Sequence, residues 1–456
     1  MPEKDIKKDF IHENIVNQDK NKGKNTVRHF AITACSALLF GLIAAAVFAF
    51  AEPRLSKRFS VEPADNSLNI SIPKDEPENA ENSEEESSSS NIQNEAAKES
   101  ESAKESESAK ETKPLDEVVK SMLSEYEYTS EDIKKFYARF DEICRKFDNC
   151  LVSVDSVKNA RDWFNNPVEK EGHYSGVILS KTETEVVILC PAAALGEADL
   201  IKVIFSDSTE NNAVLKAVDK ISGLAVIYVP TAEINPNILE TIEPAVLGNS
   251  YQVTRGNTVM AVGSPLGLSR SVSYGYISHI ARDISVTDGS ARLFYSDLKT
   301  DAEAGSFIIN LDGEIIAWVT DNYNNQNNTG ISIAYAISDY KELIEKMING
   351  EAAQYIGIEA VNVSNKMKES GIPEGIYVGT VVSGSPVYNS GIQTGDIIKA
   401  LNGQEITNIN SYIKFLNELS IGNDIVITVM RNNGKDEYKE LNFNIKIGER
   451  LLRKGN

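Results

Sequence analysis

Short β-branched apolar runs fill the middle of the chain from residue 151 to about residue 337, and Gly, Asn, Asp or Pro residues separate them. Typical runs read "EVVILC", "LAVIYV" and "TVMAVG". Long stretches with a helical period are almost absent from this region. So many strands joined by turns predict a closed all-β architecture of about two barrels. The next stretch, "DYKELIEKMING", predicts a helix that ends at Gly350.

The segments on either side of this region have a different pattern. From residue 355 to about residue 447, strands alternate with two short helical pieces, which predicts a separate small α+β module. Residues 114–148 carry apolar side chains at helical spacing, and Thr129 or Ser130 can cap the second of two helices. We expect these helices to pack on the barrels through the apolar face formed by Ile133, Phe136, Tyr137, Phe140 and Ile143.

An uncharged run of 22 residues, 30–51, is long enough to cross a bilayer as one helix. A signal peptide cleaved after Ala51 is the competing interpretation, but the apolar run and the 29 residues before it are long for one. The sequence therefore favours an uncleaved single-pass anchor. Basic residues flank both ends, and we expect residues 1–29 to be cytoplasmic and the main domains to lie outside.

Residues 52–113 lead from this run to the first predicted helix, and their second half is strongly acidic. The stretch 75–113 holds thirteen acidic residues against four lysines, and Ile92 is its only large apolar side chain. Such a segment has nothing to bury, so we expect a disordered linker.

Charge and composition exclude some classes of function. The formal net charge of -21 argues against a nucleic-acid partner, because phosphate binding needs a basic surface. Four cysteines and four histidines without metal-ligand spacing predict no metal site, and we expect no cofactor.

Several motifs resemble one known family. The stretches "YSGVILS", "DKISGLAVI", "LGNSYQVTRGNTVMAVGSPLGLSRSVSYGYIS", "TDA" and "NLDGEIIAW" stand in the order and near the spacing of the HtrA family of serine proteases. The resemblance implies a chymotrypsin/trypsin-like double β-barrel over residues 149–350 and a PDZ domain over residues 351–456. The chain is then mainly β, with the predicted membrane helix and linker in front.

Two positions of the family's catalytic triad lack the required side chains. The chemistry needs a histidine base and a carboxylate that orients it. In "VILCPAA" the histidine position falls on Ala192, with Pro191 and Ala193 beside it. In "DKISGLAVI" the aspartate position falls on Gly223, and Asp219 matches another, non-triad aspartate of the pattern.

The third position lies in a shortened nucleophile loop. The family has about twelve residues between its Thr-Asp-Ala and Asn-Leu-Asp-Gly motifs, including Gly-Asn-Ser-Gly-Gly-Pro, whereas only Glu303–Ile309 stand here. Counting back from Asn310 puts Ala304 at the serine position, and Ser306 is the only serine in the gap. Since an oxyanion hole is a particular backbone turn, the deletion is expected to remove it as well. The sequence predicts a pseudoprotease.

Other residues offer weaker substitutes for the triad. His173 and His279 lie outside the triad positions and are expected to be surface or structural histidines. Cys190 lies two residues from the lost histidine, and we interpret it as a buried strand cysteine because no histidine is placed to activate it. Cys144 and Cys150 leave a disulfide or two free thiols open, since their spacing requires a chain turn between them.

The C-terminal module keeps the parts of a peptide-binding groove. In the resemblance, "YIGIEA" is the carboxylate-binding loop, and "SYIKFLNEL" is the helix that lines the groove. A bound peptide would add as a strand, with its terminal carboxylate on backbone N–H groups. The predicted binding residues are Tyr355, Ile356, Gly357 and Ile358 in the loop and Tyr412, Ile413 and Leu416 on the helix.

These inferences lead to one functional hypothesis and two alternatives. We expect a membrane-anchored, catalytically inactive HtrA-like protein that binds C-terminal or apolar peptide segments and acts as a scaffold or regulator. Envelope protein quality control is what the resemblance implies. One alternative is a divergent active endopeptidase that uses Ser306, and the other is a structural subunit in an oligomer with active HtrA-like subunits.

Overall fold

The computed structural model describes residues 69–76, 129–161, 167–196, 198–323, 330–434 and 437–453, and these described residues belong to one compact unit. The predicted cytoplasmic tail 1–29, the membrane run 30–51, most of the linker 52–113 and the helical stretch 114–128 lie outside the described residues. Within the described part of the chain, every helix is too short or too polar to cross a bilayer.

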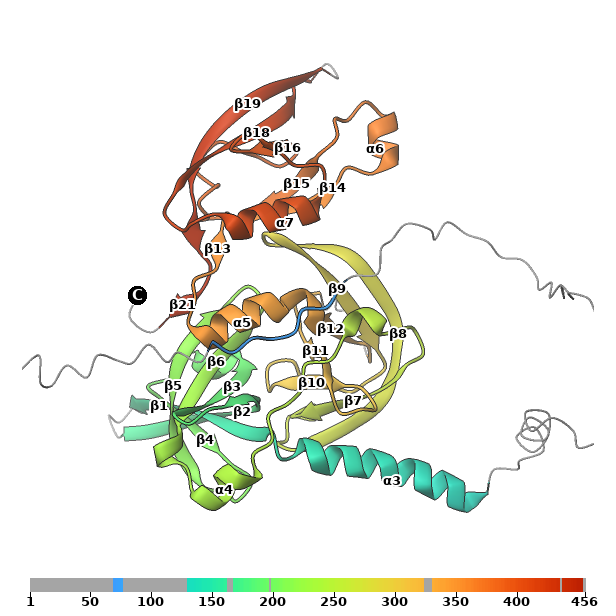
Figure 1. Ribbon diagram of the computed structural model, residues 1–456, viewed down its shortest axis with the longest axis vertical. Helices are drawn as coiled ribbons and strands as arrows, with labels where there is room; N and C mark the ends of the chain where they lie inside the picture. The colour runs from blue at the N-terminus through green and yellow to red at the C-terminus, as the bar shows by residue number, and fades with distance from the viewer. Residues whose placement is uncertain are drawn as a thin grey trace, which may run out of the picture. The chain divides into compact units, whose positions relative to one another are not determined.

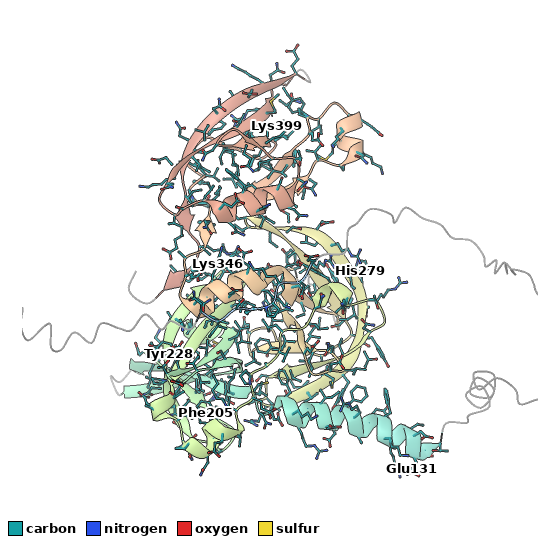
Figure 2. All side chains as sticks on the ribbon, viewed as in Figure 1. Glu131, Phe205, Tyr228, His279, Lys346 and Lys399 are labelled. Atoms are coloured by element: carbon teal, nitrogen blue, oxygen red, sulfur yellow. The ribbon has the colours of Figure 1, made fainter. Side chains whose placement is uncertain are left out.

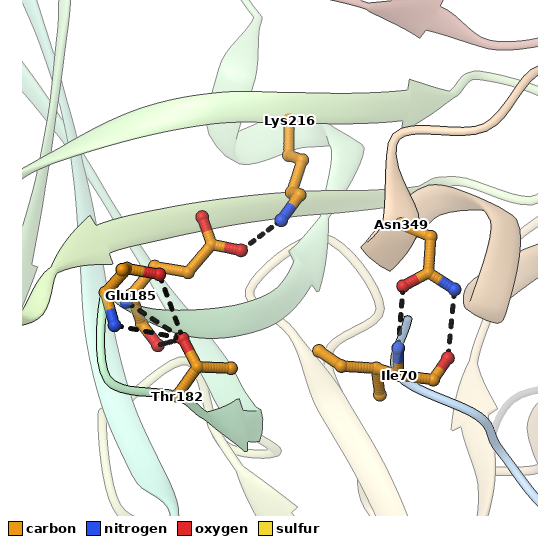
Figure 3. A network of polar contacts seen from close by, with 6 residues as sticks. Ile70, Thr182, Glu185, Lys216 and Asn349 are labelled. Atoms are coloured by element: carbon orange, nitrogen blue, oxygen red, sulfur yellow. Dashed lines mark hydrogen bonds and ion pairs between the residues drawn. The ribbon is translucent and has the colours of Figure 1, made fainter. Parts of the chain in front are cut away.

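The first barrel consists of six antiparallel strands in the order β5-β4-β1-β2-β3-β6, and pairing between β5 and β6 closes it (Figure 1). The most apolar strands are β3 and β6, and nearly all of their residues are buried on both faces. Lys216 of β5 pairs with Glu185 of β3, whose backbone is also bonded by Thr182 (Figure 3). The strands are β1 (Leu151–Arg161), β2 (Pro167–Lys181), β3 (Glu185–Pro191), β4 (Leu200–Ile204), β5 (Glu210–Asp219) and β6 (Leu224–Pro230).

The second barrel is closed in the order β10-β11-β12-β9-β8-β7. Its longest strands, β8 and β9, form a hairpin that turns at Thr287 and Asp288. The predicted double barrel is thus confirmed. The strands are β7 (Thr258–Gly263), β8 (Ser271–Val286), β9 (Gly289–Ser296), β10 (Ser306–Ile309), β11 (Ile315–Val319) and β12 (Ser332–Ala336).

Short helices connect these strands and close the domain. The predicted helix after the second barrel is confirmed as α5 (Lys341–Asn349), and Gly350 ends it in the left-handed conformation, with φ of 67°. The other connecting pieces are η1 (Ala192–Leu195), η2 (Thr231–Glu233), α4 (Pro236–Thr241), η3 (Ser250–Gln252) and η4 (Ile337–Tyr340).

Residues 69–76 form an extended segment with specific contacts on η4 and α5. The side chain of Asn349 bonds both the N–H and the C=O of Ile70, as Figure 3 shows. Asp75 accepts a hydrogen bond from Ser338 and forms an ion pair of 2.8 Å with the buried Lys341. These eight residues lie within the stretch expected to be disordered, so that expectation does not hold for them. Bonds to side chains of η4 and α5 hold the segment, and Ile70 and Ile72 pack against the main apolar core.

Helix α3 (Ser130–Phe147) precedes the first barrel, and Thr129 begins it with a capping box to Asp132. Its C-terminal half packs on the barrels through the buried side chains of Phe140, Ile143 and Phe147. Ile133, Phe136 and Tyr137 are more than half exposed. The expectation that the whole apolar face packs on the barrels is therefore wrong for the N-terminal half.

The C-terminal module is a sheet in the order β14-β15-β16-β18-β19, with β17 paired to β16 and a separate apolar core under α7. Its elements are β13 (Gln354–Tyr355), β14 (Ile358–Asn362), α6 (Asn365–Glu369), β15 (Ile376–Val381), β16 (Ile397–Leu401), β17 (Gln404–Glu405), α7 (Ile409–Glu418), β18 (Asp424–Asn432), β19 (Tyr438–Lys446) and β20 (Gly448–Glu449).

The chain returns to the first barrel after this module. Strand β20 pairs with β13, and β21 (Leu452–Arg453) pairs with Ala217 and Val218 of β5. Between them, the buried guanidinium of Arg450 donates to Asp219 over 2.9 Å. Residues 452 and 453 therefore extend the sheet of the first barrel, although the sequence placed them in the C-terminal domain.

Candidate functional site

The histidine and aspartate positions of the family pattern lie next to each other between the barrels. Ala192 begins η1 directly after β3, and its N–H donates to the carbonyl of Gly223 over 2.8 Å. Gly223 has φ of 74° in the turn before β6. The fold brings the two positions together as the resemblance implies, but neither side chain can accept or hold a proton.

The shortened nucleophile loop is a tight turn, and hydrogen bonds of the Ala304 backbone hold it in place. The N–H of Ala304 donates to Asp301 Oδ1 over 3.0 Å, and its carbonyl accepts from the N–H of Ser175 on β2 over 2.8 Å. At Gly305, φ is 86°, and an added Cβ would lie 2.4 Å from the Ser175 carbonyl. The N–H at the serine position is thus already bonded, so it cannot serve an oxyanion.

Ser306 is the first residue of β10, and its hydroxyl donates to the Asp301 carbonyl over 2.6 Å. Its exposed fraction is only 2%. The only serine of the shortened loop is therefore part of a strand. A buried hydroxyl whose proton is given to a backbone carbonyl has no base to activate it.

A cavity of about 200 Å³ is lined by Gly223 and by neighbours of the other two positions, Ala193 and Glu303. Its wall includes Gly223, Glu303, Ser306 and Trp318, and none of the residues that line it is a histidine or a cysteine. The Trp318 indole donates to the Ser222 carbonyl over 3.2 Å. The cavity is therefore a cleft in the place of an active site, and its lining offers neither a histidine nor a cysteine.

The substitute residues considered from the sequence lie in other surroundings. His173 on β2 bonds Asp155 on β1 over 2.9 Å, and its side chain is 66% exposed. His279 lies on the exposed side of β8 against Tyr295 (Figure 2). Burial raises the pKa of the Cys190 thiol to about 12, so it is not ionised near neutral pH. None of these three residues lines the cleft.

Cys144 and Cys150 are free thiols. The Cys150 thiol donates to the Phe147 carbonyl over 2.9 Å, and the Cys144 thiol contacts Met260. The structure therefore has two separate thiols where the sequence left a disulfide open.

The predicted carboxylate-binding loop binds a carboxylate of the same chain. The N–H groups of Ile356, Gly357 and Ile358 donate to the side chain of Asp288 over 2.8 to 3.1 Å. The Tyr412 hydroxyl donates to the same carboxylate over 2.9 Å. Burial raises the pKa of the Asp288 carboxyl, and these four donors act in the opposite direction.

A glycine sets the shape of this loop. Gly357 has φ of 92°, and an added Cβ would lie 2.0 Å from the Cβ of Ser385. A positive φ allows three consecutive N–H groups to point at one place, which is how a backbone nest binds an anion. Tyr355 precedes the loop on β13, with its hydroxyl close to Gly357.

The groove helix α7 supplies the remaining predicted residues. A capping box between Asn408 and Ser411 begins the helix. Tyr412 and Leu416 are buried in the core of the module, whereas Ile413 is only partly buried. In the predicted groove between β14 and α7, the loop N–H groups and the Tyr412 hydroxyl converge on Asp288, and Ile413 and Leu416 line a cavity beside it. That all seven residues bind a peptide stays a prediction.

The β8–β9 hairpin lies along this groove, next to α7 and β14 (Figure 1). The Asp288 N–H donates to the Ile358 carbonyl over 2.7 Å, and Thr287 forms an antiparallel bridge with Glu359. The Ser285 hydroxyl donates to the Ala360 carbonyl over 3.0 Å. Sequence reasoning missed Asp288, because "TDGS" signals only a hairpin turn and not what its carboxylate contacts.

No group of three or more His, Cys, Asp or Glu side chains among the described residues is arranged to hold a metal ion.

Comparison with known proteins identifies the two domains that carry these sites. Residues 174–317 match the trypsin-like peptidase domain family, and residues 354–447 match the PDZ domain family. A solved structure of the HtrA-type protease AlgW, in a substituted form with a decapeptide, has a TM-score of 0.50 at 21% identity. It covers 69% of this chain and 98% of that one, and it shows the fold.

Curated relatives extend the match across both domains. "Serine protease Do-like HtrA" of Bacillus subtilis is 27% identical over 297 residues, which are 61% of this chain and 64% of that protein. This chain therefore spans slightly less than two thirds of that relative's length. "Serine endoprotease DegS" of Haemophilus influenzae is 28% identical, over 67% of this chain and 86% of its own.

A further relative decides the family. "Serine protease HTRA2, mitochondrial" of Drosophila erecta is 30% identical over 324 residues, which cover 63% of this chain and 72% of the relative. Together with the double barrel and the C-terminal module, this similarity shows that the chain belongs to the HtrA family of trypsin-like, PDZ-containing serine proteases.

Proposed function

We propose that this protein binds the carboxyl-terminal ends of other proteins, or apolar peptide segments, through its PDZ domain and does not hydrolyse them. The observation that carries the proposal is the convergence of four donors, three backbone N–H groups and the Tyr412 hydroxyl, on one carboxylate. A site that already holds an aspartate carboxylate has the donors for a peptide carboxylate. Ile413 and Leu416 beside it are suited to a last apolar side chain.

The residues at the three triad positions support the proposal that the protein does not hydrolyse peptides. Ala192, Gly223 and Ala304 provide no base, no orienting carboxylate and no nucleophile. The alternative, an active endopeptidase that uses Ser306, is opposed by the bond from that hydroxyl to the Asp301 carbonyl.

We also propose that the protein is anchored by residues 30–51, with its domains outside the cytoplasm, as a scaffold or regulator in envelope protein quality control. The apolar run supports the anchor. The "Probable periplasmic serine endoprotease DegP-like" of Halomonas elongata, 26% identical, supports the placement outside. Assembly with active HtrA-like subunits is tested by their co-purification with the tagged protein.

Peptide binding is tested with the full-length protein on an array of ten-residue peptides that end in Val, Ile, Leu or Phe. We expect selective binding that disappears when the same peptides carry amidated ends. Gly357→Ala is expected to abolish binding, whereas Gly371→Ala is the matched control, because Gly371 has φ of 83° and open space for a Cβ. Absence of any selective binder would refute the binding proposal.

Hydrolysis is tested with an unfolded casein substrate and a serine-reactive phosphonate probe. We expect neither cleavage nor labelling. Activity that is present in the wild type and lost in Ser306→Ala would establish the endopeptidase alternative instead.

A further inference from the structure

The β8–β9 hairpin has the same relation to β14 that an external peptide would have. It runs antiparallel to β14, as the bridge between Thr287 and Glu359 and the bond from Asp288 N–H to Ile358 demonstrate. At its end, a carboxylate enters the nest of N–H groups. A peptide that adds as a strand uses the same backbone groups and the same nest. The two arrangements require the same atoms, so they exclude each other.

We propose that the turn Thr287-Asp288-Gly289 is an internal ligand of the PDZ groove, and that an external peptide carboxylate binds only after displacing Asp288. For the external ligand, this inference rests on the proposed peptide binding. For the internal contact, it rests only on the bonds of Asp288 described above.

Two properties of Asp288 favour its replacement by the carboxylate of an external peptide. Asp288 is a non-glycine residue with φ of 57°, a left-handed conformation that glycine adopts with less strain. It is also buried and forms no ion pair with a described lysine or arginine, so its charge is stabilised mainly by hydrogen bonds, with the nearby Arg450 guanidinium as the closest favourable charge. Because the contact is intramolecular, however, no association entropy opposes it.

An external ligand has an additional contact available. Gly289 follows Asp288, and its nearest groove atom is Cδ1 of Ile413, about 4.0 Å from where a Cβ would be. A cavity of about 120 Å³ remains here, lined in part by Val286, Gly289, Ile413 and Leu416. Because residue 289 is a glycine, the hairpin contributes no side chain to this space at that position. A peptide with an apolar last residue fills it and gains burial that Asp288 does not provide.

Displacement has a structural consequence for the protease-like domain. The hairpin is an extension of the second barrel, and the Arg450 guanidinium links it to the first, since it donates to the Thr287 carbonyl over 3.3 Å and to Asp219 over 2.9 Å. A peptide that removes the turn from the groove also breaks the bond between Thr287 and Arg450. Ligand binding is thereby communicated to the barrels.

The test compares two matched substitutions in the full-length protein. Asp288→Gly removes the internal carboxylate, whereas Asp283→Gly is its control, because Asp283 lies exposed on the same hairpin with nearly the same φ, 56° against 57°. Glycine adopts both conformations without strain. If glycine loosens the turn, Asp288→Asn repeats the test with a side chain of the same shape.

Hydrogen exchange measures the internal contact. We expect the amides of Ile356, Gly357 and Ile358 to exchange at least tenfold faster in Asp288→Gly than in the wild type, and unchanged in Asp283→Gly. Equal exchange in all three proteins would overturn the proposal.

Peptide affinity measures the competition, with the same array of free carboxyl ends. We expect half-saturation at a concentration at least tenfold lower for Asp288→Gly, because the wild-type groove is open in only a fraction of molecules. Equal affinities would overturn displacement and leave the proposed function standing. Faster exchange without peptide binding to any variant would support the internal ligand and refute the proposed function.

Discussion

The cleft between the barrels and the carboxylate-binding loop of the PDZ domain belong to one chain, yet their chemistry has different origins. Catalysis in the cleft would depend on side chains, and Ala192, Gly223 and Ala304 supply none that react. Anion binding in the loop depends on backbone N–H groups, and only the conformation of Gly357 is needed to aim them. A site made of backbone keeps its chemistry through most substitutions, whereas a site made of side chains loses it with a few. The predictions below address this difference, beginning with the largest expected effect.

The Cys190 thiol lies two residues from the histidine position, and its reactivity tests whether this buried region holds a usable nucleophile. Complete burial raises its pKa from 9.0 to about 12. Alkylation by iodoacetamide at about pH 8 is therefore expected to be about a thousandfold slower than in the unfolded chain. Mass spectrometry of the modified peptides measures the rate, with the half-buried Cys144 as the internal comparison.

The raised pKa of Cys190 also predicts that the stability of the folded state decreases at high pH. Because the folded state retains the thiol proton, stability is full below about pH 9 and falls as the pH rises toward 12. Fast labelling of native Cys190 at neutral pH would contradict the proposed inertness of the cleft.

Gly305→Ala is expected to destabilise the protein by about 3 kcal/mol or more, because the new Cβ meets a backbone carbonyl that cannot move aside. Gly313→Ala is the control, since Gly313 also has positive φ, 83°, but only an ordinary contact with Ile143, and it is expected to cost about 1 kcal/mol. Denaturant unfolding measures both. Equal losses would mean that the trimmed loop is not held against β2 as described.

Ser306→Ala is expected to cost about 1 kcal/mol of stability, from the lost hydrogen bond to the Asp301 carbonyl. It should leave peptide binding unchanged. Thermal unfolding and the peptide array measure the two quantities, and a change in binding without a change in stability would assign Ser306 a functional role.

Restoring the triad side chains is expected to have the smallest effect. The triple variant Ala192→His, Gly223→Asp and Ala304→Ser should remain inactive toward casein and the phosphonate probe. The N–H at position 304 stays bonded to Asp301, and the missing residues of the loop are not restored. Hydrolysis by this variant would show that side chains alone separate the cleft from an active site.

Much of the fold was predictable because it depends on regular patterns. The β-branched runs predicted the two barrels, and the motif spacing assigned Ala192 and Gly223 to two positions of one site, which the fold brings together. The resemblance also predicted the carboxylate-binding loop, whose N–H groups do hold a carboxylate.

Features that depend on single contacts were not predictable. Helix α3 carries an apolar face throughout, but nothing in its sequence indicates that Ile133, Phe136 and Tyr137 extend beyond the barrels. Residues 69–76 are ordered by bonds from Asn349 and Lys341, which are more than 250 residues away in the chain. Asp288 belongs to this class, since a turn motif does not reveal which distant amides its side chain binds.

The pairing of β21 with β5 affects the order in which the protein folds during translation. Arg450 and its partner Asp219 are 231 residues apart, so during synthesis the first barrel exists for many seconds before the ribosome delivers the strand that covers its edge. Until then, β5 presents unpaired backbone groups, and the carboxylate of Asp219 lacks its cation. This edge of β5 is therefore covered only after residues 452 and 453 have left the ribosome.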